Sequence, residues 1–143
     1  MKRSVSQEAI ESLKVQLICH EGLICKPTRN AQGELIIGVG RKLEHVGVSE
    51  QEAERMLEND ITSLIRILTH ELPIFNQQSE LRKLVLVNMA FSIGVEGLKK
   101  LKKLLAALCV EDYTLAADEI WHGGWISEHS DRAMELAIMM KQG

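Results

Sequence analysis

Apolar residues recur at helical spacing over most of the chain. The positions from Ile10 to Leu17 predict a first amphipathic helix. Ser4 or Ser6 can cap its start, and Gly22 is expected to end it. The first 22 residues therefore indicate one helix with a defined stop.

Residues 26–43 show a different pattern. Pro27 rules out a continuing helix, and the sequence Asn-Ala-Gln-Gly at 30–33 is typical of a turn. The segment 35–39, Leu-Ile-Ile-Gly-Val, is rich in β-branched residues. We therefore expect a small β-hairpin lobe over about residues 24–45, with no comparable β signal elsewhere.

A long helix is predicted after the hairpin. Ser49 and Glu52 have the S-x-x-E spacing of a capping box, and Pro73 closes the segment. Apolar residues step along it by three or four and are expected to face inward: Ala53, Leu57, Ile61, Leu64 and Leu68.

Four further helices are predicted in the C-terminal half. They cover 79–93, ending at Gly94, then 98–108, 112–121 and 130–140. The fold class is thus mainly α, or α+β counting the hairpin. We expect one domain over 1–143, with a helical lobe of about 70–143 plus the N-terminal helix.

Composition and charge exclude several classes of protein. The 143 residues are 45% hydrophobic and 26% charged, which is ordinary for a globular domain. A net charge of −3 and 3% aromatic residues argue against a nucleic-acid-binding protein. No helix-length apolar run of about 18 residues and no signal peptide are recognised, so no membrane association and a cytoplasmic location are expected.

No metal or other cofactor is predicted. The cysteines are odd in number and form no C-x-x-C pair, so they are expected to be buried free thiols: Cys19, Cys25 and Cys109. The histidines have no recognised ligand spacing: His20, His45, His70, His122 and His129. Lysines at 99, 100, 102 and 103 are placed on the predicted fourth helix, as a solvated face or as a patch that steers the protein toward an anionic polymer.

Glu21 has two interpretations. It falls at the C-terminal end of the first helix, where the helix dipole disfavours an ionised carboxylate. A carboxylic acid that stays protonated can act as a general acid. Taken alone, the local sequence favours the simpler alternative, a solvated residue at a helix end.

The order of these features resembles the lysozymes of tailed bacteriophages, glycoside hydrolase family 24, over residues 10–143. The resemblance starts at His-Glu-Gly-Leu (20–23) and continues through a hairpin ending Ile-Gly-Val-Gly-Arg (37–41) and the capped long helix. It extends through Asn-Met-Ala-Phe-Ser-Ile-Gly (88–94), Trp125 and Arg-Ala (132–133) before the last helix.

This resemblance implies a fold and a substrate. The family has a small β-hairpin lobe joined by a long helix to a helical lobe, and the cleft between them binds the glycan strand of peptidoglycan. Its members hydrolyse the β-1,4 bond between N-acetylmuramic acid and N-acetylglucosamine. We expect a monomer with no cofactor. An endolysin of this type needs a separate holin-type pore to reach the cell wall.

The family's catalytic positions transfer only in part. Its signature is Glu, then after eight residues Asp or Cys, then after five residues Thr. Glu21 matches the acid, but the other two positions are Asn30 and Ile36. Arg132 matches an arginine that pairs with the catalytic glutamate, and Phe91 matches an aromatic residue of the cleft.

The two departures affect the chemistry directly, because glycoside hydrolysis normally requires two carboxylates. Asn30 is neutral and Ile36 has no hydroxyl to hold a water. Glu34 lies on the hairpin, where the family register places it near the turn rather than in the cleft. The sequence therefore predicts a catalytically impaired or inactive pseudoenzyme that keeps a peptidoglycan-binding cleft or serves an unknown protein partner. The alternative is an active muramidase with Glu21 as general acid.

Overall fold

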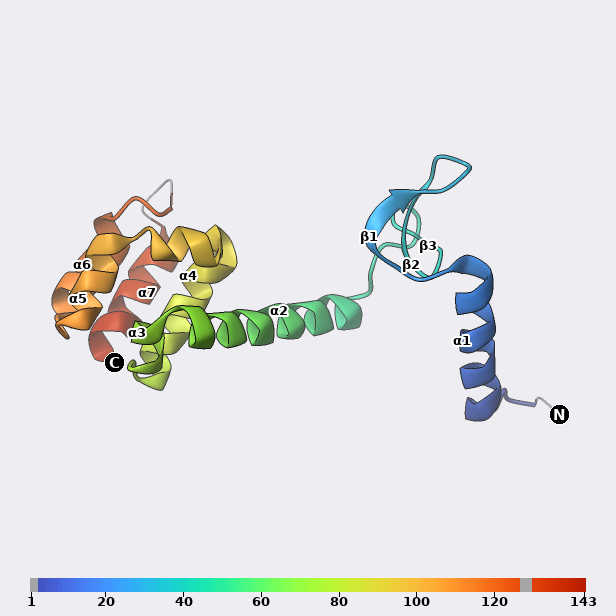
Figure 1. Ribbon diagram of the computed structural model, residues 1–143, viewed down its shortest axis with the longest axis horizontal. Coiled ribbons are helices and arrows are strands. Elements are labelled where there is room, and N and C mark those ends of the chain that lie inside the picture. The colour runs from blue at the N-terminus through green and yellow to red at the C-terminus, as the bar shows by residue number, and fades with distance from the viewer. Residues whose placement is uncertain (1–2, 127–129) are drawn as a thin grey trace. The chain divides into compact units, whose positions relative to one another are not determined.

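The computed structural model describes residues 3–126 and 130–143, so His129 lies outside the described residues. The chain divides into two compact units, Met1–Ala53 and Glu54–Gly143. Within the described ranges there are seven helices and one three-stranded antiparallel sheet (Figure 1). The predicted mainly α, lysozyme-like class is confirmed.

The first unit contains a helix and the sheet. Its elements are α1 (Gln7–Glu21), β1 (Ile24–Arg29), β2 (Leu35–Gly38) and β3 (Arg41–Lys42). Ser6 is the cap of α1, since its Oγ accepts a hydrogen bond from the N–H of Ala9 at 3.2 Å. Gly22, with φ of 77°, ends the helix as expected. The assignment of this helix to the helical lobe stays a prediction.

The sheet has the order β1-β2-β3, with both pairs antiparallel. Ile36 of β2 is paired with Thr28 on one side and with Lys42 on the other. Strand β3 was not predicted because two residues are too short to show an alternating pattern. Val39, expected in the strand, instead lies in the turn that leads to β3.

The capping box at the start of α2 (Glu50–Glu71) is confirmed. The Glu52 N–H donates to Ser49 Oγ at 3.1 Å, and the Ser49 N–H donates to Glu52 Oε1 at 3.0 Å. Arg41 of β3 also donates to both Glu52 carboxylate oxygens at 2.6 Å. One carboxylate therefore closes the helix end and attaches it to the sheet.

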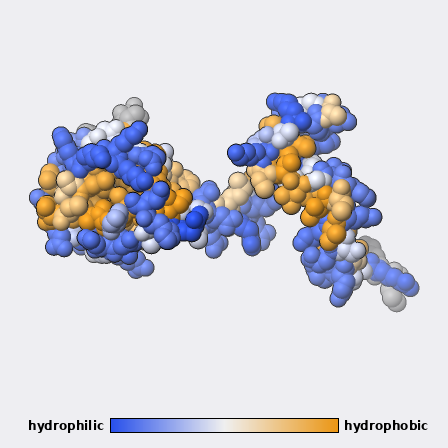
Figure 2. Space-filling model, viewed as in Figure 1, coloured by the Kyte–Doolittle hydropathy of each residue, from blue (hydrophilic) through white to orange (hydrophobic). Residues whose placement is uncertain are grey.

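The second unit holds the hydrophobic core. Its helices, after α2, are α3 (Pro73–Asn76), α4 (Glu80–Lys99), α5 (Lys102–Cys109), α6 (Tyr113–His122) and α7 (Asp131–Gln142). The core is formed by fully buried side chains from all of these helices and α2; the largest are Leu68, Leu86, Met89, Leu98, Leu108, Ile120 and Met140. Hydrophobic side chains also reach the surface of this unit (Figure 2).

Arg82 connects three helices of this unit. Its Nε donates to the carbonyl of Met140 in α7 at 2.8 Å. Its guanidinium carbon lies 3.3 Å from the centroid of the Tyr113 ring in α6, a cation–π contact. The polar end of a residue on α4 therefore anchors both C-terminal helices.

The predicted break at Gly94 is observed, but the following helix boundary was wrong. Gly94 has φ of 77° and interrupts the helical backbone within α4. Leu98 lies in the last turn of α4, and α5 begins only at Lys102. The four lysines are therefore spread over the end of one helix and the start of the next, and Lys99 pairs with Glu96 at 3.2 Å.

The inward stripe predicted along α2 is correct only in its C-terminal half. Leu68 is completely buried and Leu64 packs against the core. Leu57 and Ile61 are 45% and 36% exposed. The apolar spacing correctly identified the face, but spacing alone does not show where along a helix the neighbouring helices stop.

A search of the described residues finds no helix with the length and hydrophobicity needed to cross a membrane.

The two halves of α2 give a stability prediction. Leu68→Ala should lower the free energy of unfolding by about 2–5 kcal/mol, because it leaves a cavity in the core. Leu57→Ala, the matched control on the same helix, should cost less than about 1 kcal/mol since half of that side chain is already in solvent. Chemical denaturation followed by circular dichroism measures both values, and equal losses would contradict the difference in burial between Leu68 and Leu57.

A second prediction concerns acid. The Arg41 guanidinium, with the backbone and hydroxyl of Ser49, lowers the pKa of Glu52 from 4.5 to about 2. A carboxyl whose pKa is lower in the folded state stabilises the fold above its unfolded pKa and loses this contribution as the pH falls. The stability difference between the parent and Glu52→Gln should therefore be constant above pH 5 and shrink between about pH 4.5 and 2. Denaturation midpoints across this range measure it; a difference independent of pH would contradict the ion pair.

Candidate functional site

Glu21 is the last residue of α1, and its carboxylate lies against the loop between β2 and β3. A Cβ added at Gly40 would be only 3.1 Å from Glu21 Oε2. Gly40 also has φ of +63°, a backbone conformation that disfavours residues with side chains. The loop can therefore approach the carboxylate closely only because residue 40 is glycine.

Asn30 organises the turn between β1 and β2. Its Oδ1 accepts hydrogen bonds from the backbone N–H groups of Gln32 at 3.0 Å and Glu34 at 2.9 Å. Its own N–H donates to the carbonyl of Glu34, and its carbonyl accepts from Gly33, both at 2.9 Å. The predicted turn is confirmed, and its conformation is held by the side chain of Asn30 as well as by the backbone.

The carboxylate of Glu34 adjoins Asn30. Asn30 Nδ2 donates to Glu34 Oε1 at 3.3 Å, and Lys42 Nζ lies 3.3 Å from Glu34 Oε2. The hydrogen bond from Asn30, followed by the interactions with Lys42 and His45, lowers the pKa of Glu34 below its ordinary value. An ionised carboxylate therefore lies within one hydrogen bond of the amide at position 30.

Ile36 lies in β2, half-buried, and faces the same side of the sheet as its cross-strand partners Thr28 and Lys42. Glu34 is two residues earlier, so it shares this face. The face thus brings together positions 30 and 36 with Glu34 and Thr28. The alternating pattern of side chains in β2 could have placed Glu34 on this face from the sequence alone. Thr28 could not be found in this way, because its position opposite Ile36 depends on the strand register.

In the second unit, Phe91 and Arg132 line the same pocket, about 220 Å³ in volume. Leu57 and Ile61 form its apolar part, which explains why these α2 residues are not in the core. The Phe91 side chain is 50% exposed. An exposed aromatic ring beside a guanidinium is an arrangement that can bind a sugar through its apolar face and its hydroxyl groups.

Arg132 is oriented by Asn88, a residue that the sequence analysis did not single out. Its Nε and Nη2 donate to Asn88 Oδ1 at 2.8 and 2.6 Å, and Nη2 also donates to the Asn88 carbonyl at 2.8 Å. The Trp125 ring lies 5.9 Å from its guanidinium carbon. The predicted pairing of Arg132 with Glu21 joins residues of different units and stays a prediction.

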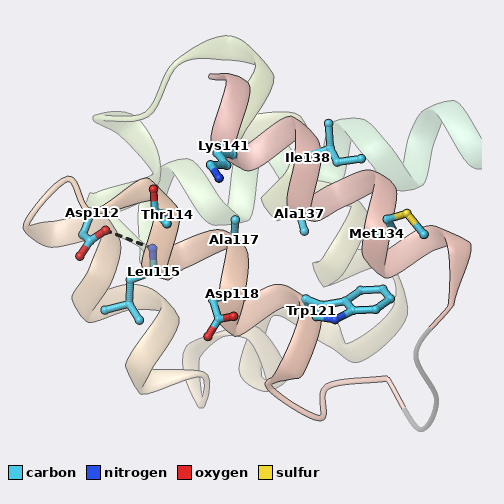
Figure 3. A pocket seen from close by; sticks show the side chains of 10 residues that line it. All are labelled: Asp112, Thr114, Leu115, Ala117, Asp118, Trp121, Met134, Ala137, Ile138 and Lys141. Carbon is cyan, nitrogen blue, oxygen red and sulfur yellow. Dashed lines mark hydrogen bonds between the residues drawn. The ribbon is translucent and has the colours of Figure 1, made fainter.

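A larger hollow, about 550 Å³, lies between α6 and α7 (Figure 3). Figure 3 shows Trp121, Met134 and Ile138 along it, with Asp118 at its edge. None of the predicted site residues lines it. A third hollow, of about 580 Å³, lies beside Lys100, Lys102 and Lys103.

In the part of the chain that the structure describes, no group of three His, Cys, Asp or Glu side chains is placed to hold a metal ion. The cysteines are free thiols, but the prediction that they are buried was wrong, because all three are exposed: Cys19, Cys25 and Cys109.

The contact of Glu21 with the β2–β3 loop can be tested with two glycine variants. Gly40→Ala and Gly38→Ala both force alanine into a positive φ, at a cost of about 1–2 kcal/mol each. Only Gly40→Ala also crowds Glu21, because nothing lies within 4 Å of the Cβ position at Gly38. The NMR shift of the Glu21 carboxyl carbon should therefore change in Gly40→Ala and stay near its parent value in Gly38→Ala. A Glu21 carboxyl shift that changes equally in both variants, or in neither, would contradict this contact.

Comparison with known proteins assigns the family. The chain is 21% identical to a protein of Dictyostelium discoideum described as probable T4-type lysozyme 2, in an alignment that covers 94% of this chain and 96% of that protein. The sequence model of the phage lysozyme family matches residues 19–135, which include Glu21, Asn30, Ile36, Phe91 and Arg132. Since this match covers most of its length, the chain belongs to the phage lysozyme family.

Proposed function

We propose that this protein binds glycan strands of peptidoglycan and is a catalytically impaired muramidase, with Glu21 as the proton donor. The observation that carries the proposal is the role of Asn30: at the family's second catalytic position stands a neutral amide whose oxygen is bound by two backbone N–H groups of the turn. Peptidoglycan is the substrate implied by the family.

Glu21 has the placement that a general acid needs. Cleavage of a glycosidic bond requires a proton on the leaving oxygen, and a carboxylic acid supplies it. Glu21 is the last residue of α1, and its carboxyl group lies against the loop between β2 and β3. The close approach of Gly40 restricts the positions open to its carboxyl group.

The impairment follows from Asn30 and Ile36. An amide cannot accept the proton of an attacking water or stabilise positive charge on the sugar, and Asn30 Oδ1 is already occupied by Gln32 and Glu34. Ile36 places only a hydrocarbon side chain on the face of the sheet that also carries position 30. Both groups that would hold and activate the water are therefore absent from their family positions.

Binding of the glycan is attributed to the second unit. The pocket of Leu57, Ile61, Phe91 and Arg132 combines an exposed ring with a guanidinium fixed by Asn88. This combination suits a sugar because the ring can cover the C–H face while the guanidinium donates to hydroxyl or carbonyl groups. A monomeric state, a cytoplasmic location and dependence on a separate pore are proposed with this function.

The test uses purified, insoluble peptidoglycan. The parent should sediment with it and slowly release soluble fragments with new reducing ends. Glu21→Gln should sediment equally but release no more than a protein-free sample, because the amide cannot donate the proton. A parent that does not sediment with peptidoglycan would overturn the proposed function, and release that persists in Glu21→Gln would overturn the assigned acid.

A matched pair of variants tests the pocket. Phe91→Ala should weaken binding by roughly fivefold to tenfold, the loss typical of an exposed aromatic contact. Leu115→Ala is the control, since its side chain is similarly exposed but lines the hollow between α6 and α7. Equal affinity of both variants would remove the Phe91 pocket from the proposal.

A further inference from the structure

We propose that Glu34 and Thr28 supply the catalytic groups that positions 30 and 36 lack. Glu34, across the turn from Asn30, supplies the carboxylate, and Thr28, opposite Ile36 in the sheet, supplies the hydroxyl. The inference rests on the proposed function and identifies the residues that carry the remaining hydrolysis. Each missing group is replaced at the position that faces it: Glu34 faces Asn30, and Thr28 faces Ile36.

The evidence for Glu34 is its contact with Asn30. The two are connected by the 3.3 Å hydrogen bond from Asn30 Nδ2 to Glu34 Oε1. The Glu34 N–H also donates to Asn30 Oδ1, and the Asn30 N–H donates to the Glu34 carbonyl. The Glu34 carboxylate therefore lies within one hydrogen-bond length of the place that a carboxylate at position 30 would occupy. Its other oxygen is paired with Lys42, which holds the side chain on this face.

The contacts of Glu34 hold its carboxylate in the ionised form, the state in which it can accept a proton. The amide of Asn30 donates to it, and Lys42 of β3 and His45 of the following segment add favourable charge, so its pKa lies below the ordinary value. Glu34 thus supplies the ionised member of the pair, and Glu21 is the proposed proton donor. A pair of carboxyl groups in opposite protonation states is what glycoside hydrolysis requires.

Thr28 offers the hydroxyl. It is paired directly with Ile36 in the sheet, so both side chains project from the same face. Thr28 Oγ1 donates its proton to the carbonyl of Lys26 at 3.2 Å. The oxygen lone pairs are left to accept a hydrogen bond from a water, which fixes the orientation of that water.

The reaction balances with these groups alone. The Glu21 carboxylic acid gives its proton to the glycosidic oxygen as the bond from that oxygen to the sugar C1 breaks, and the electron pair stays on the leaving oxygen. A water held by Thr28 attacks C1, and its proton passes to the Glu34 carboxylate. Proton exchange with solvent then returns Glu34 to its ionised form and Glu21 to its protonated form.

Glu34 and Glu21 lie near opposite ends of β2. Glu34 immediately precedes β2, whereas Glu21 lies against Gly40, just beyond the other end of this strand. The backbone positions 34 and 38 are roughly 13 Å apart at ordinary strand spacing. A separation of this order between the two ends of the strand is compatible with a water between the carboxyl groups, as direct attack by water requires.

The first experiment compares isosteric variants in the peptidoglycan assay. Glu34→Gln keeps an oxygen that can accept from Asn30 but removes the base, and should lower the Glu21-dependent rate by at least about tenfold. Glu44→Gln is the control, because Glu44 is exposed in the same unit, outside the contacts of Glu34. Thr28→Val should lower the rate and Thr28→Ser should retain it, because only the hydroxyl matters in this mechanism.

An exchange variant separates chemistry from loss of structure. Asn30→Asp combined with Glu34→Gln moves the carboxylate back across the same hydrogen bond, and Asp at 30 can still accept the two turn N–H groups. It should recover at least the parent rate. Recovery would not occur if Glu34→Gln acted only by disturbing the turn.

The pH profile supplies an independent readout. The acid limb of the rate should follow the ionisation of Glu34, so Lys42→Met, which removes a cause of the lowered pKa, should move this limb to higher pH. A Glu34→Gln variant as active as the parent, or an acid limb unmoved by Lys42→Met, would overturn this inference and leave the proposed function standing. A parent that binds peptidoglycan without Glu21-dependent hydrolysis would overturn both the inference and the muramidase assignment.

Discussion

The hydrogen bonds of Asn30 are the constraint on which the sheet and its chemistry depend. Its side-chain oxygen accepts from two backbone N–H groups, which fixes the reversal between β1 and β2. The reversal sets the register that pairs Thr28 with Ile36, and it places the Glu34 carboxylate against the Asn30 amide. An asparagine at this position is thus a structural part of the turn as well as the loss of a charge.

Polar contacts are prominent in the first unit because it has little buried hydrocarbon of its own. No residue from 3 to 53 is buried, whereas the second unit has a continuous core. The turn of Asn30 and the carboxylate of Glu52, bound by Arg41 and Ser49, define how its strands connect to each other and to the start of α2. Exposed ion pairs contribute little free energy, so these contacts specify the geometry of the unit more than its stability.

Local signals predicted much of the fold, because caps and turns depend on a few neighbouring residues. The Ser49–Glu52 box, the turn at 30–33 and the break at Gly94 are all of this kind. The exposure of Leu57 was missed because it depends on where the packing of α2 ends. Likewise, Asn88 as the partner of Arg132 was missed because the two are 44 positions apart, beyond any local pattern.

The same distinction applies to the catalytic positions. When each position is compared with the family signature on its own, Asn30 and Ile36 count as lost catalytic groups. Such a comparison does not consider the residues that face these two positions. In an antiparallel sheet, two directly opposed residues have Cβ atoms about 5 Å apart. A functional group carried by the opposite residue is therefore displaced by only about that distance. A carboxylate added at position 30 would then stand within hydrogen-bond distance of Glu34, and repulsion between the two would raise the pKa of one of them. The asparagine at position 30 avoids this repulsion and instead donates a hydrogen bond to the ionised Glu34 carboxylate.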